Sequence, residues 1–175
     1  MLNPELSTPL QVLHKLEREM HRAFHHRNYM HKADHFFNFC ITALSLKDVV
    51  LHHLGLTTDT DKSPYYEKWS NVDCLKAATE IANTAKHFQL RKFPDTKAVE
   101  RTRSIVVNVL IGPNGELKNV EENAPDLKVI LSDDSEINLY EFTREVIDYW
   151  KDYLNTIGIK YVHQDEHTFF GDDEP

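Results

Sequence analysis

The chain has 175 residues, of which 41% are hydrophobic, and this is enough to bury one core without disulfides or a structural metal. Its formal net charge of −8 argues against a non-specific nucleic-acid binder with a broad basic face. The first residues lack a basic stretch followed by an apolar one, and no segment approaches the roughly 18 apolar residues of a membrane span. We therefore expect a cytoplasmic protein with no membrane partner.

The charge is distributed unevenly along the chain. Residues 1–115 carry 15 Lys and Arg against 12 Asp and Glu, whereas residues 116–175 carry 5 against 16. A local basic patch in the first part is therefore compatible with the acidic total. At the other end, residues 163–175 are predicted to form a flexible acidic tail.

Two helices are predicted at the start of the chain. Thr8 and Gln11 form a capping pattern, and apolar residues then recur at helical spacing to about His31. Residues 33–54 are apolar nearly all round, which predicts a central helix, and Gly55 ends it.

A polar loop and two further helices follow. Residues 57–63 are typical of a loop, and Pro64 opens a short helix that runs to Trp69. Residues 70–73 cap a third long helix, whose apolar residues keep the helical period to Phe88. This third helix holds the candidate functional cluster.

The pattern then changes to strand. Residues 104–111 are β-branched and aliphatic, residues 112–115 carry a turn signal, and residues 127–131 predict a second strand. A third strand is expected near Ile137. The region has too few apolar positions to be stable alone, so residues 104–138 are predicted to be an insertion in a helical domain.

A last helix begins at a capping pattern after Asn138 and ends at Gly158. The predicted fold is mainly α (α+β): a bundle of about four long helices with a small antiparallel β-sheet inserted before the last helix. Residues 1–162 form a single helical domain in this prediction.

Cys40 and Cys74 both fall inside predicted helices, and two cysteines are too few for a disulfide framework in a chain of this length. They are predicted to be reduced, packed thiols.

The 11 histidines include several pairs at i, i+4 spacing, which is the spacing that lets two side chains on a helix share one metal ion. No pair has a third ligand that the sequence assigns, so a solvated or subunit-contacting surface is preferred and no metal or other cofactor is predicted. The pairs are His21 with His25, His31 with His35, and His163 with His167.

The candidate catalytic residues lie on the third helix. Asn83, Lys86 and His87 occupy positions i, i+3 and i+4, so a helix presents them on one face. His87 is suited to proton transfer near neutral pH, Lys86 to stabilising charge on a phosphate, and Asn83 to orienting either. Asp48 is a supporting residue, because a carboxylate on a buried helix needs a partner. The alternative is structural: the cluster satisfies buried polar groups, and Lys86 pairs with Asp48 or a neighbouring acid.

Residues 74–88, the segment from Phe37 to Asp48, and residues 150–154 resemble a group of small uncharacterised bacterial and phage-borne helical proteins. Members read roughly Arg-Asp-x-x-Asn-x-x-Lys-His in the third helix and carry a His ahead of the Asp in the second. The group is similar in outline to HEPN domains, helical bundles that are often dimeric ribonucleases of toxin or defence systems. The resemblance implies a homodimer, an RNA partner and a bacterial or phage conflict setting.

The sequence departs from this pattern at two positions. Thr79 stands where the resemblance expects Arg, and Ser45 stands where it expects His. Arg18 and His25 meet the spacing rule of the HEPN pair, but such a match is expected by chance in a segment so rich in histidine. If the chain is an enzyme, it is a ribonuclease-like hydrolase that lacks its most diagnostic residue.

Two hypotheses follow for the function. The first is a HEPN-like protein that associates with itself and with RNA, with His87, Lys86 and Asn83 as its site. The second is a non-catalytic protein-interaction module, which contacts partners through the His-rich first helix or the acidic tail. The sequence has no glycine-rich phosphate loop and no Ser-His-Asp, Cys-x-x-Cys or His-Glu-x-x-His motif, so nucleotide hydrolysis and acyl transfer are not predicted.

Overall fold

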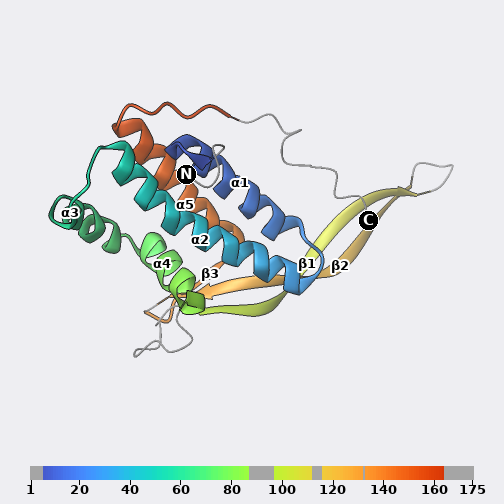
Figure 1. The fold of residues 1–175 in the computed structure, drawn as a ribbon. Coiled ribbons are helices and arrows are strands. Elements are labelled where there is room, and N and C mark those ends of the chain that lie inside the picture. The colour runs from blue at the N-terminus through green and yellow to red at the C-terminus, as the bar shows by residue number, and fades with distance from the viewer. Residues whose placement is uncertain (1–5, 87–96, 112–115, 132, 164–175) are drawn as a thin grey trace.

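The computed structural model describes residues 6–86, 97–111, 116–131 and 133–163 (Figure 1). Within these residues the chain forms five helices and a three-stranded sheet. The helices are α1 (Pro9–His25), α2 (Tyr29–His53), α3 (Asp59–Ser70), α4 (Asp73–Lys86) and α5 (Leu139–Thr156). The strands are β1 (Lys97–Ile111), β2 (Glu116–Ile130) and β3 (Glu136–Asn138). This order confirms the predicted mainly helical fold with a small antiparallel sheet before the last helix.

The ends of α1, α2 and α5 follow the predicted capping chemistry. The Gln11 N–H donates to Thr8 Oγ1 at 3.3 Å, and the Thr8 N–H donates to the Gln11 side chain at 3.1 Å. Asn138 caps α5 through its side chain. After α2 and α5, Gly55 and Gly158 adopt positive φ angles of 74° and 83°, which glycine does without a steric cost.

Two helices begin earlier than predicted. α2 starts ahead of Ala33, because the Asn28 side chain accepts hydrogen bonds from two backbone N–H groups of the first turn. α3 takes up most of the predicted loop 57–63, since Thr58 caps it and acidic residues in the first turn stabilise its start. Pro64 therefore lies inside α3. The loop prediction is wrong because the same polar residues supply helix caps.

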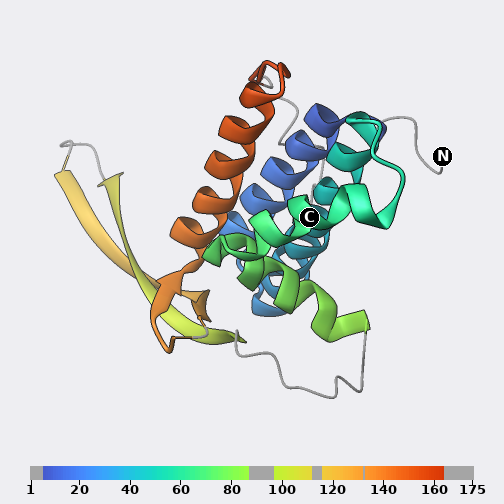
Figure 2. The same cartoon turned by 90° about the vertical axis from the view of Figure 1, so that its left-hand side faces the viewer.

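The core lies among α1, α2, α4 and α5 (Figures 1 and 2). α1 packs against α2 and α5, and α2 also packs against α4. α3 has one buried residue, Trp69, whose ring centroid lies 5.4 Å from that of Trp150 and 5.7 Å from that of Tyr153 on α5. Aromatic contact therefore anchors α3, rather than an apolar face of its own.

β1 and β2 form a long antiparallel hairpin that extends away from the helices (Figures 1 and 2). Its register pairs Lys97 with Ile130 beside the helices and Ile111 with Glu116 at the far end. β3 pairs antiparallel with the end of β2. Both predicted strands are parts of longer ones, so the sheet begins at Lys97 rather than near residue 104.

The base of the hairpin is packed into the helical core. Leu127 and Val129 are buried, and Asp126 lies 3.9 Å from Lys32 of α2 with both side chains almost fully enclosed. This buried ion pair joins the start of α2 to β2. The division into one domain over residues 1–162 and an acidic tail stays a prediction, and residues 164–175 of that tail lie outside the described residues.

Candidate functional site

A partly buried polar contact joins α2 to α4. Lys47 is 5% exposed, and its Nζ donates a hydrogen bond of 2.7 Å to Thr79 Oγ1. The Thr79 hydroxyl in turn donates to the Leu75 carbonyl at 2.7 Å. Burial lowers the pKa of Lys47 to about 8. We call Lys47 and Thr79 the α2–α4 seam.

The predicted catalytic cluster lies beyond this seam on α4. Asn83 is one helical turn after Thr79, on the same face, and is half-buried. Lys86 is the last residue of α4, and the structure describes its backbone only. His87 lies outside the described residues. The catalytic roles of Asn83, Lys86 and His87 therefore stay predictions.

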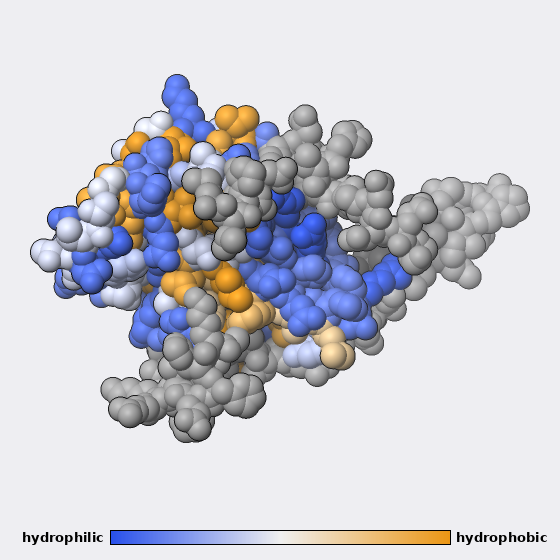
Figure 3. All heavy atoms as spheres, in the orientation of Figure 1, coloured by the Kyte–Doolittle hydropathy of each residue, from blue (hydrophilic) through white to orange (hydrophobic). Residues whose placement is uncertain are grey.

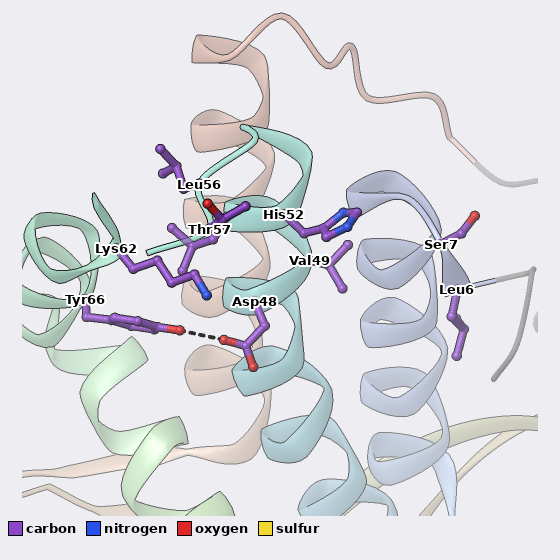
Figure 4. Close-up of a pocket in the computed structure, with 10 residues that line it drawn as sticks. Leu6, Ser7, Asp48, Val49, His52, Leu56, Thr57, Lys62 and Tyr66 are labelled. Atoms are coloured by element: carbon purple, nitrogen blue, oxygen red, sulfur yellow. Dashed lines mark hydrogen bonds between the residues drawn. The ribbon is translucent and has the colours of Figure 1, made fainter. Parts of the chain in front are cut away.

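Asp48 is exposed rather than buried, and its supporting role at the predicted site stays a prediction. Its carboxylate accepts a hydrogen bond of 2.7 Å from the Tyr66 hydroxyl of α3 (Figure 4). Burial, together with this hydrogen bond, raises the pKa of Tyr66 to about 12. The buried charge on this stretch of α2 is the neighbouring Lys47, because the helix turns about 100° per residue and α4 covers only one of the two positions.

An open pocket of about 630 Å³ lies beside Asp48, between α2, α3 and the turn before α1 (Figure 4). Lys62 and Tyr66 point from α3 toward Asp48, and Val49 adds apolar surface to the lining. Sequence reasoning missed this pocket, because its walls depend on the docking of α3 through Trp69. Its opposite charges over apolar surface suit the binding of a small amphipathic group.

The two positions that depart from the pattern of the proteins that the sequence resembles carry hydroxyl groups bonded within their own helices. Thr79 donates to the Leu75 carbonyl, and Ser45, which is exposed, donates to the Ile41 carbonyl at 2.9 Å. Neither side chain carries a charge or a proton-transfer group of the kind that the resemblance expects there. The Thr79 hydroxyl also accepts from Lys47, so it bonds both within α4 and across the α2–α4 seam.

Cys40 and Cys74 are free and buried, which confirms the prediction of packed, unbridged thiols. Burial raises the pKa of both groups, that of Cys74 to about 11. Thiolate is therefore scarce at both positions near neutral pH, as expected for structural cysteines.

A cationic surface lies where α1 ends and α2 begins; we call residues 18–35 the α1–α2 corner. Arg22 and Arg27 are exposed and Arg18 is half-buried. Figure 3 shows hydrophilic residues gathered over this part of the molecule. Five histidines share the corner: His21, His25, His26, His31 and His35.

The corner contains two acids, and only one of them is exposed. Glu19 is buried, and its carboxylate oxygens lie 3.0 Å from His35 Nδ1, 3.4 Å from Arg22 Nη1 and 3.7 Å from Lys15 Nζ. Asp34 is the exposed acid. Glu19 thus holds α1 to α2 from within, while the arginines remain at the surface around it.

The histidine rings of the corner lie against one another. The ring centroids are 4.1 Å apart for His21 and His25 and 4.8 Å apart for His26 and His31. Within the residues that the structure describes, no three or more His, Cys, Asp or Glu side chains are arranged to hold a metal ion. The paired histidines contribute packed ring surface to the corner.

None of the helices in the described ranges is both long enough and apolar enough to cross a membrane. Comparisons with protein-family models, with curated proteins and with solved structures find no match to this chain.

Proposed function

We propose that this chain is an RNA-associated helical protein that binds RNA through the α1–α2 corner. The observation that carries the proposal is the charge of that surface. Arg18, Arg22 and Arg27 share it with one exposed acid, Asp34, because Glu19 is buried. Arginine forms paired hydrogen bonds with phosphate oxygens, and phosphate contacts supply most of the affinity of non-specific nucleic-acid binding.

Apolar and aromatic side chains accompany the arginines. Tyr140 of α5 is 45% exposed, and its ring centroid lies 5.4 Å from that of Phe24 on α1. Met30, at the start of α2, is 73% exposed. Unpaired bases stack on exposed aromatic rings, so single-stranded RNA fits this surface better than a duplex.

The resemblance of the sequence to HEPN-like helical proteins supports the same proposal. It extends the proposal to a homodimer and to a bacterial or phage conflict setting. Sedimentation of the purified chain across a concentration range tests the homodimer. Because Thr79 and Ser45 replace the expected Arg and His, the proposal favours binding over cleavage.

RNA binding is tested by fluorescence anisotropy with a labelled single-stranded RNA at several salt concentrations. We expect Arg18→Gln/Arg27→Gln to weaken binding by about tenfold and to make the salt dependence shallower, by roughly 0.7 in log–log slope for each phosphate that is no longer neutralised. Lys62→Gln/Lys68→Gln on α3 removes the same charge and serves as the matched control. Equal weakening in the two variants, or no binding by the wild type, contradicts the proposal.

The enzymatic form of the hypothesis has its own test. Wild-type protein and His87→Ala are incubated with RNA, and the products are separated by size. We expect binding without cleavage in both. Cleavage by the wild type that His87→Ala abolishes would restore the predicted roles of His87, Lys86 and Asn83.

The second candidate function is a non-catalytic protein-interaction module, which the α2–α4 seam favours because its polar groups are bonded internally. It predicts that Asn83→Ala lowers the melting temperature of the protein without changing its affinity for RNA. A variant with an unchanged melting temperature and impaired RNA binding contradicts this alternative.

A further inference from the structure

One face of α1 carries a stripe of basic residues along most of its length. His14, Arg18, His21 and His25 follow at spacings of four, three and four, so they lie within one narrow sector of the helix. We call these four residues the α1 stripe. Its last three members belong to the α1–α2 corner.

The C-terminal part of the described chain already lies on the start of this stripe. His14 Nε2 donates to the Val162 carbonyl at 2.8 Å. The Tyr161 hydroxyl donates to Glu17 Oε1 at 2.8 Å, and Lys151 Nζ lies 2.7 Å from the same oxygen. Because Glu17 is 6% exposed, these contacts hold residues 161 and 162 firmly against α1.

The segment after α5 leads toward the α1 stripe. The segment after α5 runs back across the end of the bundle to α1 (Figure 1), and its last described residue is His163. The chain therefore leaves the described residues beside the first member of the stripe, with Arg18 one helical turn farther along α1.

The residues that follow have the complementary charge. Residues 164–175 contain five acids and no Lys or Arg. Asp165 and Glu166 follow Val162 by three and four residues, a reach of about 10–14 Å for extended chain. His14 and His21 are roughly 10 Å apart along α1. Both carboxylates are therefore within reach of Arg18 and His21.

We propose that the acidic segment 164–175 docks along the α1 stripe of its own chain, with Asp165 and Glu166 at Arg18 and His21, and so shields the α1–α2 corner. The docking stands on the contacts of residues 161 and 162 and on charge complementarity. Its consequence for RNA rests on the proposed function. A tethered acidic segment competes at high effective concentration, so RNA must offer several phosphates at once to displace it.

Disulfide trapping tests the docking without RNA. His21→Cys/His167→Cys keeps both acids and Arg18, and the native cysteines are buried. Lys68→Cys/His167→Cys, with its first cysteine on exposed α3, is the control pair. Under mild oxidation we expect at least about fivefold more intramolecular disulfide in the first pair, because tethering raises the local concentration. Adding Asp165→Asn/Glu166→Gln to the first pair should remove most of that excess.

Two outcomes of the trapping overturn the docking. Equal trapping in the two pairs shows that the segment has no preference for the stripe. Disulfide-linked dimers in place of closed monomers show that the stripe is occupied by a second copy of the chain instead.

RNA affinity provides the second readout. We expect Asp165→Asn/Glu166→Gln to bind single-stranded RNA about three- to tenfold more tightly than the wild type, because the competing segment loses charge. Asp148→Asn/Asp152→Asn on α5 makes the same change in net charge and should have a smaller effect. Preferential trapping without any RNA binding would contradict the proposed function but support the docking. RNA binding without preferential trapping would support the proposed function but contradict the docking.

Discussion

The α2–α4 seam and the α1–α2 corner are both built from polar residues on helices, yet they place their charges differently. At the seam, Lys47 is buried and its ammonium group is bonded to Thr79. At the corner, Arg22 and Arg27 remain at the surface. A buried cation must satisfy its donors inside the protein, whereas an exposed one can exchange water for a ligand. This difference suits the seam to a structural role and, under the proposed function, the corner to binding.

The α1–α2 corner itself contains both buried and exposed cations. Lys32 is 1% exposed, donates to the Phe24 carbonyl at 2.9 Å and faces Asp126 of β2. It belongs with Lys47 among the buried cations, although it follows Arg27 closely in the sequence. Variants that separate the two kinds of cation therefore test the comparison.

The largest effect is expected from Asp126→Ala. It leaves the buried charge of Lys32 without its partner, which should lower the free energy of unfolding by roughly 3–5 kcal/mol. Urea denaturation measures this decrease. Asp34→Ala, an exposed acid on the same helix as Lys32, should change stability by less than about 0.5 kcal/mol. Similar decreases in both variants would show that the buried pair has no special role.

A smaller effect is expected from the pH dependence of Lys47. Its pKa is about 8 in the folded protein against an ordinary value of 10.5, so the folded state holds fewer protons between these limits. Stability should therefore rise with pH across this window, by at most about 3 kcal/mol, and the cost of the charged group is fully present below it. Lys47→Met should lack this rise. Parallel stability curves for the two proteins from pH 7 to pH 9.5 would contradict the assignment.

Removing the partner at the seam should cost less. Thr79→Val keeps the shape of the side chain but deletes the oxygen that accepts from Lys47, which should lower stability by about 1–3 kcal/mol. The exposed Ser45→Ala is the control, with an expected change of less than about 0.5 kcal/mol. If Thr79→Val melts at the wild-type temperature, the seam does not stabilise the bundle.

The variant that should weaken RNA binding is expected to lose less stability than Asp126→Ala or Thr79→Val. Arg18→Gln/Arg27→Gln should alter the free energy of unfolding by no more than about 1 kcal/mol, because Arg27 is exposed and Arg18 is only half-buried. Thermal denaturation of the samples used for RNA binding checks this. A large decrease in stability would show that these arginines stabilise the fold, as Lys32 and Lys47 do.

Sequence patterns correctly predicted the helix ends that are set by capping residues and glycines close by in the chain. The capping groups Thr8 and Asn138 begin α1 and α5, and Gly55 and Gly158 lie at the ends that were expected. The sheet also appears where β-branched residues predict strands, although its strands are longer. The start of α3 was not predicted. Thr58 and the acids after it are common both in loops and at helix starts, so composition alone does not distinguish the two.

Sequence patterns were sufficient to place most of the helical segments and their apolar faces, and to show that positive charge gathers early in the chain and negative charge late. Which charged groups are buried depends on the tertiary structure. Lys47 and Asp48 are adjacent, yet only Lys47 is enclosed, since α4 covers one side of α2 and an open pocket lies on the other. It also brought Val162 onto His14, a contact between residues far apart in the sequence that no local pattern encodes. Burial and long-range contacts depend on which helices pack against one another. The periodicity of a single helix shows its apolar face but not its packing partner.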